Sequence, residues 1–359
     1  MLKRALLPLV FLLLLAPAHA TATTILTPAQ LVARGIDPMM FSMVTFSEDG
    51  NMLLGIERTK DLKLKVQGIS HLLRIFQFRA GKLVRLDTVP LPTSAFEQLS
   101  LNPPGSKAVV IGEGGSKFIE VDLSARTARV FWTHKRGTAG FRSEMVAWWY
   151  NGVCYLLGYL HDTQDNVIFD GVVRLNPSKR GHEIFEAGLD KRPVQRALGA
   201  LLFEMYVNER EAFFGVTRRS DLVEVYHYLN GKLTKLDEAL AIGGIASAPS
   251  RILYAARYVN GRRDLVLRDM ALKKTWHLGK DNLPYNYLFL SGDGKTAVLT
   301  LMDFRNNTMS YFYARESDGF KVKPLAPLQD VKPGTLRLAS GGRVFAYYGP
   351  SGLIYGTIP

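Results

Sequence analysis

The chain has 359 residues, 47% of them hydrophobic and 21% charged, and carries a formal net charge of +13 at pH 7. Its single cysteine, Cys154, excludes an internal disulfide, so stability must come from burial and strand pairing. Beyond the first twenty residues, no stretch approaches the length of a membrane span without charges, so we expect no transmembrane segment there.

The first twenty residues have the pattern of an export signal. Lys3 and Arg4 precede an apolar run over residues 5–17, and an Ala-x-Ala cleavage site follows at residues 18–20. The run is shorter than the about 20 residues of a membrane span, and no cysteine follows it to accept a lipid. We therefore predict a signal peptide over residues 1–20 and a periplasmic or secreted protein. An uncleaved N-terminal anchor is the alternative.

The charge balance bears on the partners of such a protein. Lys3 and Arg4 leave with the leader, so the mature chain would carry +11. An exported protein this basic is expected to meet anionic partners, namely an acidic glycan, lipid phosphates or an acidic protein surface, whereas nucleic acid is not expected in that compartment. An excess of charge that only keeps the protein soluble is the alternative.

Seven runs along the chain share one plan, an apolar strand, a tight turn and a second apolar strand. Their turns end at residues 50, 105, 152, 209, 250, 294 and 342, so the spacings lie between 41 and 57 residues. Four-stranded propeller blades repeat at about 40–50 residues, and the Asp-Gly and Asn-Gly turns favour hairpins. The period predicts an all-β fold, a seven-bladed β-propeller of four-stranded blades. The spacings of 55 and 57 leave a six-bladed ring with an irregular insert open.

The seventh unit lacks an outer strand, because the chain stops after a strand-like run over residues 353–358. Residues 23–26, just after the predicted cleavage site, can supply this strand, which would close the last blade and remove an open sheet edge. Thr27, Pro28 and Gln30 then have the pattern of N-cap, N1 and N3, so we expect one short helix there. The predicted domains are a signal peptide over residues 1–20 and a single β-propeller over residues 21–359.

Several turns carry a motif that is roughly Phe-Ser-x-Asp-Gly-x. It stands as Phe46-Ser47-Glu48-Asp49-Gly50-Asn51 and, more loosely, over residues 101–106 and 290–295. In this motif the repeat resembles the WD40-like and TolB-type β-propeller family, although the Trp-Asp ending of WD40 repeats is absent. The resemblance implies a fold and carries no function.

Chemical motifs are scarce. The chain has neither a Gly-x-Ser-x-Gly elbow nor a His-Glu-x-x-His pair, so we predict no catalytic residue, no metal site and no cofactor. The cluster over residues 161–166 could bind Ca²⁺, but it lacks the Asp-x-Asp-x-Asp-Gly pattern and favours a polar turn. Cys154 lies in an apolar run and is predicted to be buried. The aromatic residues at 148–150 and 285–287 could stack on sugars, but their predicted innermost strands favour core packing.

The most suggestive feature is a set of basic residues in the loops. In a four-stranded blade, the connection between the second and third strands lies on the same face as the connections between blades. We call this the loop face, and on it we place the candidate ligand-binding residues Lys135, Arg136, Lys191, Arg192, Arg218, Arg219, Arg262, Arg263 and Arg305, together with Lys60, Lys63 and Lys65. Guanidinium groups match carboxylates and phosphates, so we hypothesise that this face binds an anionic partner. Pairing with acids in the same loops (Asp61, Asp190, Asp221, Asp264 and Asp303) is the alternative.

Two functions remain open from the sequence. The first is an exported, non-enzymatic binding or scaffold propeller that recognises an anionic ligand or partner through the loop face. The second is a propeller-class hydrolase or lyase acting on an acidic glycan or small ester. An enzyme would need carboxylates or histidines that converge at the mouth of the central channel.

Overall fold

The computed structural model describes residues 21–102, 104–135, 137–143, 148–150, 153–175, 185–189, 201–208, 210–217, 222–279, 285–303, 308–325, 336–339 and 341–358. The predicted signal peptide lies outside these residues. Within them, strands dominate, and the helical elements are α2 (Pro28–Ala33), α3 (Leu62–Val66) and the 3-10 turn η3 (Glu316–Asp318). No described helix is long and apolar enough to cross a membrane.

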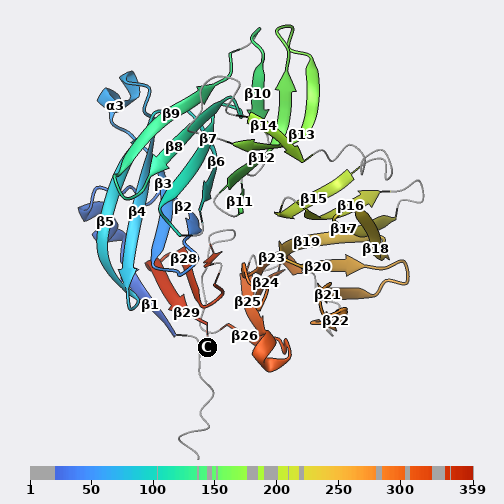
Figure 1. Ribbon diagram of the computed structural model, residues 1–359. Helices are drawn as coiled ribbons and strands as arrows, with labels where there is room; N and C mark the ends of the chain where they lie inside the picture. Colours follow the sequence, from blue (N-terminus) through green and yellow to red (C-terminus); the bar gives the residue numbers. More distant parts are fainter. Residues whose placement is uncertain are drawn as a thin grey trace, which may run out of the picture.

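The described strands form seven antiparallel sheets set around a common centre (Figure 1). Five of the sheets follow the chain in order, four strands each: β2 (Phe41–Phe46), β3 (Met52–Arg58), β4 (His71–Arg79) and β5 (Lys82–Leu91); β6 (Phe96–Leu101), β7 (Lys107–Gly112), β8 (Lys117–Asp122) and β9 (Thr127–Thr133); β15 (Leu201–Asn208), β16 (Glu211–Thr217), β17 (Val223–Leu229) and β18 (Lys232–Ala239); β19 (Ala241–Ala248), β20 (Arg251–Arg257), β21 (Arg263–Asp269) and β22 (Lys274–His277); β23 (Tyr285–Leu290), β24 (Thr296–Asp303), β25 (Thr308–Arg315) and β26 (Lys323–Pro324).

The other two sheets depart from this plan. One contains β10 (Gly140–Ser143), β11 (Trp148–Tyr150), β12 (Val153–His161), β13 (Val167–Leu175) and β14 (Phe185–Leu189), and both β10 and β11 pair with β12. The last contains β27 (Arg337–Leu338), β28 (Val344–Gly349), β29 (Gly352–Thr357) and β1 (Thr21–Leu26). The all-β propeller prediction is confirmed, with five strands rather than four in the β10–β14 sheet. The number of blades in the ring stays a prediction.

The predicted turns at Gly50, Gly294 and Gly342 join the first and second strands of their sheets and also contact the neighbouring sheet. Gly342, between β27 and β28, has φ 67°, a left-handed conformation that suits glycine. A Cβ at this position would lie 2.6 Å from Thr296 Cβ and 2.8 Å from Ser291 Cβ, both in the preceding sheet. Gly50, between β2 and β3, meets Val344 of the last sheet at 2.9 Å in the same way. The turn motif therefore sets the close approach of one sheet to the next.

The N-terminal strand completes the last sheet, as predicted. β1 pairs antiparallel with β29, with Thr21 opposite Thr357 and Thr23 opposite Tyr355. It begins two residues earlier than the sequence suggested. The helix that follows is capped as expected, because Gln30 N donates to Thr27 Oγ1 at 3.2 Å and Thr27 N donates to Gln30 Oε1 at 2.9 Å. The two ends of the described chain thus share one sheet.

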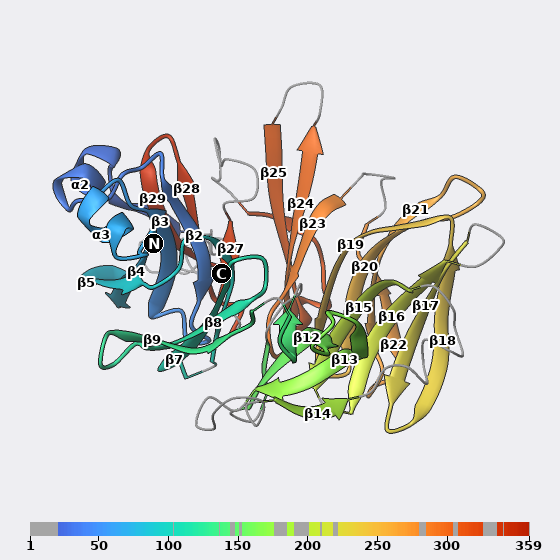
Figure 2. The same ribbon diagram turned by 90° about the horizontal axis from the view of Figure 1, so that it is seen from above.

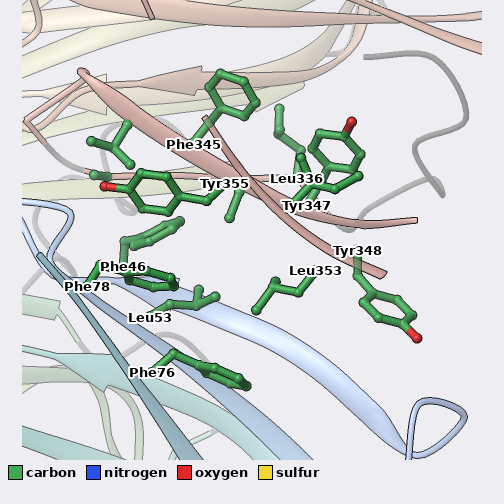
Figure 3. Close-up of a cluster of buried hydrophobic side chains, with 14 of the residues drawn as sticks. Phe46, Leu53, Phe76, Phe78, Leu336, Phe345, Tyr347, Tyr348, Leu353 and Tyr355 are labelled. Carbon is green, nitrogen blue, oxygen red and sulfur yellow. The ribbon is translucent and has the colours of Figure 1, made fainter. Parts of the chain in front are cut away.

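A large hydrophobic cluster lies between this closing sheet and its neighbours (Figure 3). Phe46 and Phe78 of the first sheet pack against Tyr355 of β29, with the Phe78 and Tyr355 ring centroids 4.7 Å apart. Phe76 and Phe345 are fully buried in the same cluster. Aromatic side chains bury large apolar areas, so this contact between sheets contributes strongly to closure of the ring.

Three smaller predictions have different outcomes. Cys154 is buried, as expected, and burial raises the pKa of its thiol. A second helix, α3, was not expected; it begins at Leu62, and its N-cap Asp61 accepts from Lys63 N at 2.8 Å. Core packing is wrong for Tyr287, whose side chain is exposed next to a register shift in β23. This irregularity in the innermost strand directs the Tyr287 side chain away from the hydrophobic core.

Candidate functional site

The sheet topology places the predicted basic loops on one side of the molecule. In each four-stranded antiparallel sheet, the connection between the second and third strands and the link to the next sheet lie at the same end of the strands. Residues 59–70, 134–139 and 258–262 belong to such connections. Figure 2 shows α2 and α3, which belong to the same set of connections, beside β3 and β4. The described loops that were assigned to the loop face therefore lie on the same side of the molecule.

Three of the nine candidate residues are described, and all three are exposed on the loop face: Lys135, Arg262 and Arg263. The Arg262 guanidinium lies 4.5 Å from the centre of the Tyr258 ring, which holds it by a cation–π contact. Its Nη2 also lies 4.0 Å from Asp264 Oδ2, at the outer limit of an ion pair. The other six candidates lie outside the described residues: Arg136, Lys191, Arg192, Arg218, Arg219 and Arg305.

The described acids of this face make specific contacts, and one of them, Asp37, pairs with the loop-face cation Lys60. Asp264 is 7% exposed, and its Oδ2 lies 2.6 Å from His277 Nδ1. Asp61 caps α3 through Lys63 N. Asp37 forms an ion pair with Lys60 at 2.5 Å and accepts from Met39 N, and the hydrogen bond from Lys60 lowers the pKa of Asp37. Asp190 and Asp221 lie outside the described residues, and Asp303 contributes no described side chain.

Lys63 and Lys65 stand on α3, a helix that buries none of its residues. The base of this loop is well anchored, since Thr59 N donates to Ser70 O at 3.0 Å and Ser70 N donates to Thr93 O at 3.0 Å. A buried pair beneath it, Arg74 Nε donating to Glu57 Oε2 at 2.6 Å, ties the loop that follows α2 to the same sheet. The lysines are therefore presented on a short, fixed projection.

The polar turn over residues 161–166 folds on itself. Asp162 Oδ1 accepts from Gln164 N at 2.8 Å and from Asn166 N at 2.9 Å, and the hydrogen bonds from Asn166 lower the pKa of Asp162. Among the residues that the structure describes, no group of three or more His, Cys, Asp or Glu side chains is arranged to hold a metal ion. The polar-turn interpretation of this segment is thus supported by its hydrogen bonds.

A cavity of about 760 Å³ lies on the opposite face, between the β23–β26 sheet and the closing sheet. Lys295, Arg315 and Arg343 line it, with Asp293 and Glu316. Glu316 is paired with Arg251 at 2.5 Å, and Arg315 donates to Ile358 O at 2.8 Å. Neither Lys295 nor Arg343 forms an ion pair with another described residue. The cavity therefore offers a rival basic site, against which the loop face has to be tested.

Sequence reasoning missed both this cavity and the apolar part of the loop face. The cavity is lined by residues of three turns and of the last strand, spread between residues 293 and 358, so no local sequence pattern predicts it. The apolar part had a visible signal, the alternation of apolar and basic residues in Leu62-Lys63-Leu64-Lys65-Val66, of which only the lysines were considered. Arg34 and Arg58, also exposed on this face, were missed as well.

No protein-family model and no curated protein sequence matches the chain. Solved structures do match. A chain of a mitotic checkpoint complex covers 96% of this chain over 96% of its own length, with 12% identity and a TM-score of 0.50. Acylaminoacyl peptidase from Pyrococcus horikoshii covers 87% of this chain over 50% of its own, with 13% identity and a TM-score of 0.53. TolB from Acinetobacter baumannii covers 84% of this chain over 68% of its own, with 13% identity and a TM-score of 0.43.

At these identities the likeness is one of fold. The resemblance to WD40-like β-propellers that the turn motif suggested is confirmed at the level of the fold. The chain spans half the length of the peptidase that it matches. Function must therefore be argued from the residues on the surface of this propeller.

Proposed function

We propose that the chain is an exported, non-enzymatic binding propeller that recognises an anionic ligand or partner through its loop face. Propellers present many loops on one face of a rigid ring, and this suits binding and scaffold roles. The partner classes that fit are those expected from the charge, an acidic glycan, lipid phosphates or an acidic protein.

One observation carries this proposal: three candidate cations of the loop face are exposed, whereas two of the acids beside them have carboxylate oxygens occupied by contacts within the protein. Lys135, Arg262 and Arg263 are exposed. Asp264 is 7% exposed and held by His277, and Asp61 is used as a helix cap. Such an imbalance leaves a positive field at the surface, which attracts anions.

Export is part of the proposal and has its own support. The leader has the charge, apolar run and cleavage site of a signal peptide. The first described strand begins at Thr21, and Thr21 already pairs with Thr357. Cleavage after Ala20 would keep every described residue of the closing strand β1. The mature protein purified from the periplasm or medium should begin at Thr21, and a mature protein that retains residues 1–20 would contradict export by cleavage.

The loop-face assignment is tested by charge reversal with a matched control. K135E/R262E/R263E changes the net charge by the same amount as K82E/K295E/R343E, whose three exposed cations belong to turns on the opposite face. We expect the loop-face variant to elute from a sulfated polysaccharide matrix at a much lower salt concentration than the control variant.

Two outcomes would refute the assignment. Equal shifts for the two variants would show that only net charge matters. A larger shift for K82E/K295E/R343E would move the site to the opposite face and its cavity. Unchanged melting temperatures should accompany all variants, because the substituted side chains are exposed.

A further inference from the structure

Large apolar side chains are exposed on the loop face next to its lysines. On α3, Leu62 is 73% exposed and Val66 is 89% exposed, and Met39, in the segment that follows α2, is 82% exposed. Val32 and Met40 are exposed as well. Single exposed apolar residues are ordinary, but a group of five within one loop region marks a contact surface. We call these five residues the apolar tip.

An ion pair and a backbone hydrogen bond hold the two segments of the apolar tip in one region. The Lys60–Asp37 ion pair joins the residue before the α3 cap to the segment that carries Met39. Arg58 N donates to Met40 O at 3.2 Å, which fixes Met40 beside the strand that leads into α3. Figure 2 shows α2 and α3 at the same margin of the molecule, and α2 also packs on the closing sheet through the buried Leu31.

Helical geometry gives α3 an amphipathic arrangement. Leu62 and Val66 are four residues apart and lie on the same side of the helix. Lys63 and Lys65 then flank that side, one on each edge, because successive residues turn by about 100°. Their long alkyl stems can lie along an apolar surface while the ammonium groups stay in a polar layer.

The charge around the apolar tip is positive. Arg34, Arg58, Lys60, Lys63 and Lys65 surround it, against Asp37 and Asp61. Asp37 is paired with Lys60, and these five cations against two acids leave a net charge of +3 around the apolar tip. Apolar side chains bordered by lysine and arginine complement the interface of an anionic bilayer, where acyl chains lie beneath phosphates.

We propose that the apolar tip docks this propeller onto an anionic lipid surface. Leu62, Val66 and Met39 enter the boundary between headgroups and acyl chains, and Lys63 and Lys65 contact lipid phosphates. This inference rests on the proposed function, since it names the lipid bilayer as the anionic partner of the loop face. It is also more specific, because a soluble polyanion offers no place for the apolar side chains.

The experiment is co-sedimentation of the mature protein with vesicles of phosphatidylglycerol and phosphatidylethanolamine, with phosphatidylcholine vesicles as the neutral comparison. We expect binding to the anionic vesicles and little binding to the neutral ones. K63E/K65E should weaken anionic-vesicle binding by at least about 25-fold, since each lysine near an anionic surface strengthens binding by about fivefold. L62S/V66S should weaken it by about tenfold or more, since both side chains leave the apolar layer.

A matched control is L272S, which changes a residue that is 62% exposed in the turn between β21 and β22, on the opposite face. Its vesicle binding should equal that of the wild type. L62S/V66S should also keep its full retention on the sulfated polysaccharide matrix, because that matrix contacts only charges. Equal loss of vesicle binding in L272S and L62S/V66S would overturn the assignment of the apolar tip.

The two proposals fail in different ways. A wild-type chain that binds the polysaccharide matrix through the loop face but does not bind anionic vesicles would overturn the lipid inference and leave the proposed function standing. A chain that binds neither would overturn both. Equal binding to anionic and neutral vesicles would also overturn the inference, because it would remove the role of the lysines.

Discussion

Asp237 is one of the carboxylates that link the β15–β18 and β19–β22 sheets, and we predict that Asp237→Ala strongly destabilises the propeller. Asp237 Oδ2 accepts from Tyr254 OH at 2.6 Å and Tyr258 OH at 3.0 Å, and lies 3.3 Å from Arg268 Nη2. Asp237 belongs to β18, whereas the three donors belong to the β19–β22 sheet and the loop after β20. The substitution therefore removes a link between sheets.

The magnitude follows from the burial of the groups left behind. Tyr254 is fully buried, so its hydroxyl would lose a partner that water cannot replace. Removal of one partner of a buried ion pair costs about 3–5 kcal/mol. Because the Arg268 side chain is 24% exposed and partly solvated, we expect the lower end of this range, about 3 kcal/mol.

The assay is equilibrium unfolding in urea, with Glu238→Ala as the control. Glu238 is the next residue, is 45% exposed and pairs with Lys235, so its loss should cost about 0–1 kcal/mol. A loss of less than about 1 kcal/mol in the free energy of unfolding for Asp237→Ala would refute the reasoning, because an exposed ion pair contributes that much.

The same substitution has a predicted pH dependence. Burial by itself raises the pKa of Asp237, but hydrogen bonds from Tyr254 and Tyr258 and the charge of Arg268 outweigh it and hold the pKa below its ordinary value. A carboxyl with a depressed folded-state pKa contributes stability above its unfolded pKa of about 3.9, and this is lost as pH falls through the folded value. The difference between wild type and Asp237→Ala should therefore shrink below about pH 4.

Three further predictions concern the ring. Gly342→Ala should lower the melting temperature more than Gly319→Ala, because both have positive φ but only the first Cβ would meet neighbouring atoms, at 2.6 Å; equal shifts would contradict the contact between sheets. A chain that starts at Thr27 lacks β1 and should lose cooperative unfolding and aggregate through the exposed β29 edge, whereas a chain that starts at Thr21 should not; identical melts would contradict closure by the N-terminal strand. Cys154 is buried and burial raises the pKa of its thiol, so a thiol reagent should label it only as the protein unfolds; rapid labelling of the native protein would contradict its burial.

The fold was largely predictable because its determinants are local and repeated. The Asp-Gly turns at Gly50 and Gly294 specify hairpins from their own residues, and their spacing reports the blade period. The closing strand was predictable for a different reason, since an incomplete last unit and a strand-like N-terminus can satisfy each other. The five-stranded β10–β14 sheet was not foreseen, because β10 and β11 divide one long partner strand between them.

The candidate site was predictable only in part. The position of Arg262 in a loop follows from the strand pattern, so its place on the loop face could be stated from the sequence. The contacts of the acids could not be predicted, because the Asp264 carboxylate is engaged by His277, which lies on the neighbouring strand β22. The exposure of Leu62 and Val66 also escaped prediction, since a five-residue helix can pack against a sheet or project from it.

The central claim is that the loop face binds the anionic partner. Amide hydrogen exchange of the mature protein, with and without a sulfated polysaccharide, tests it directly. We predict slower exchange over residues 59–70 and 258–262, and unchanged exchange over residues 291–295 and 341–343, which border the opposite cavity. Slower exchange confined to residues 291–295 and 341–343 would contradict the account.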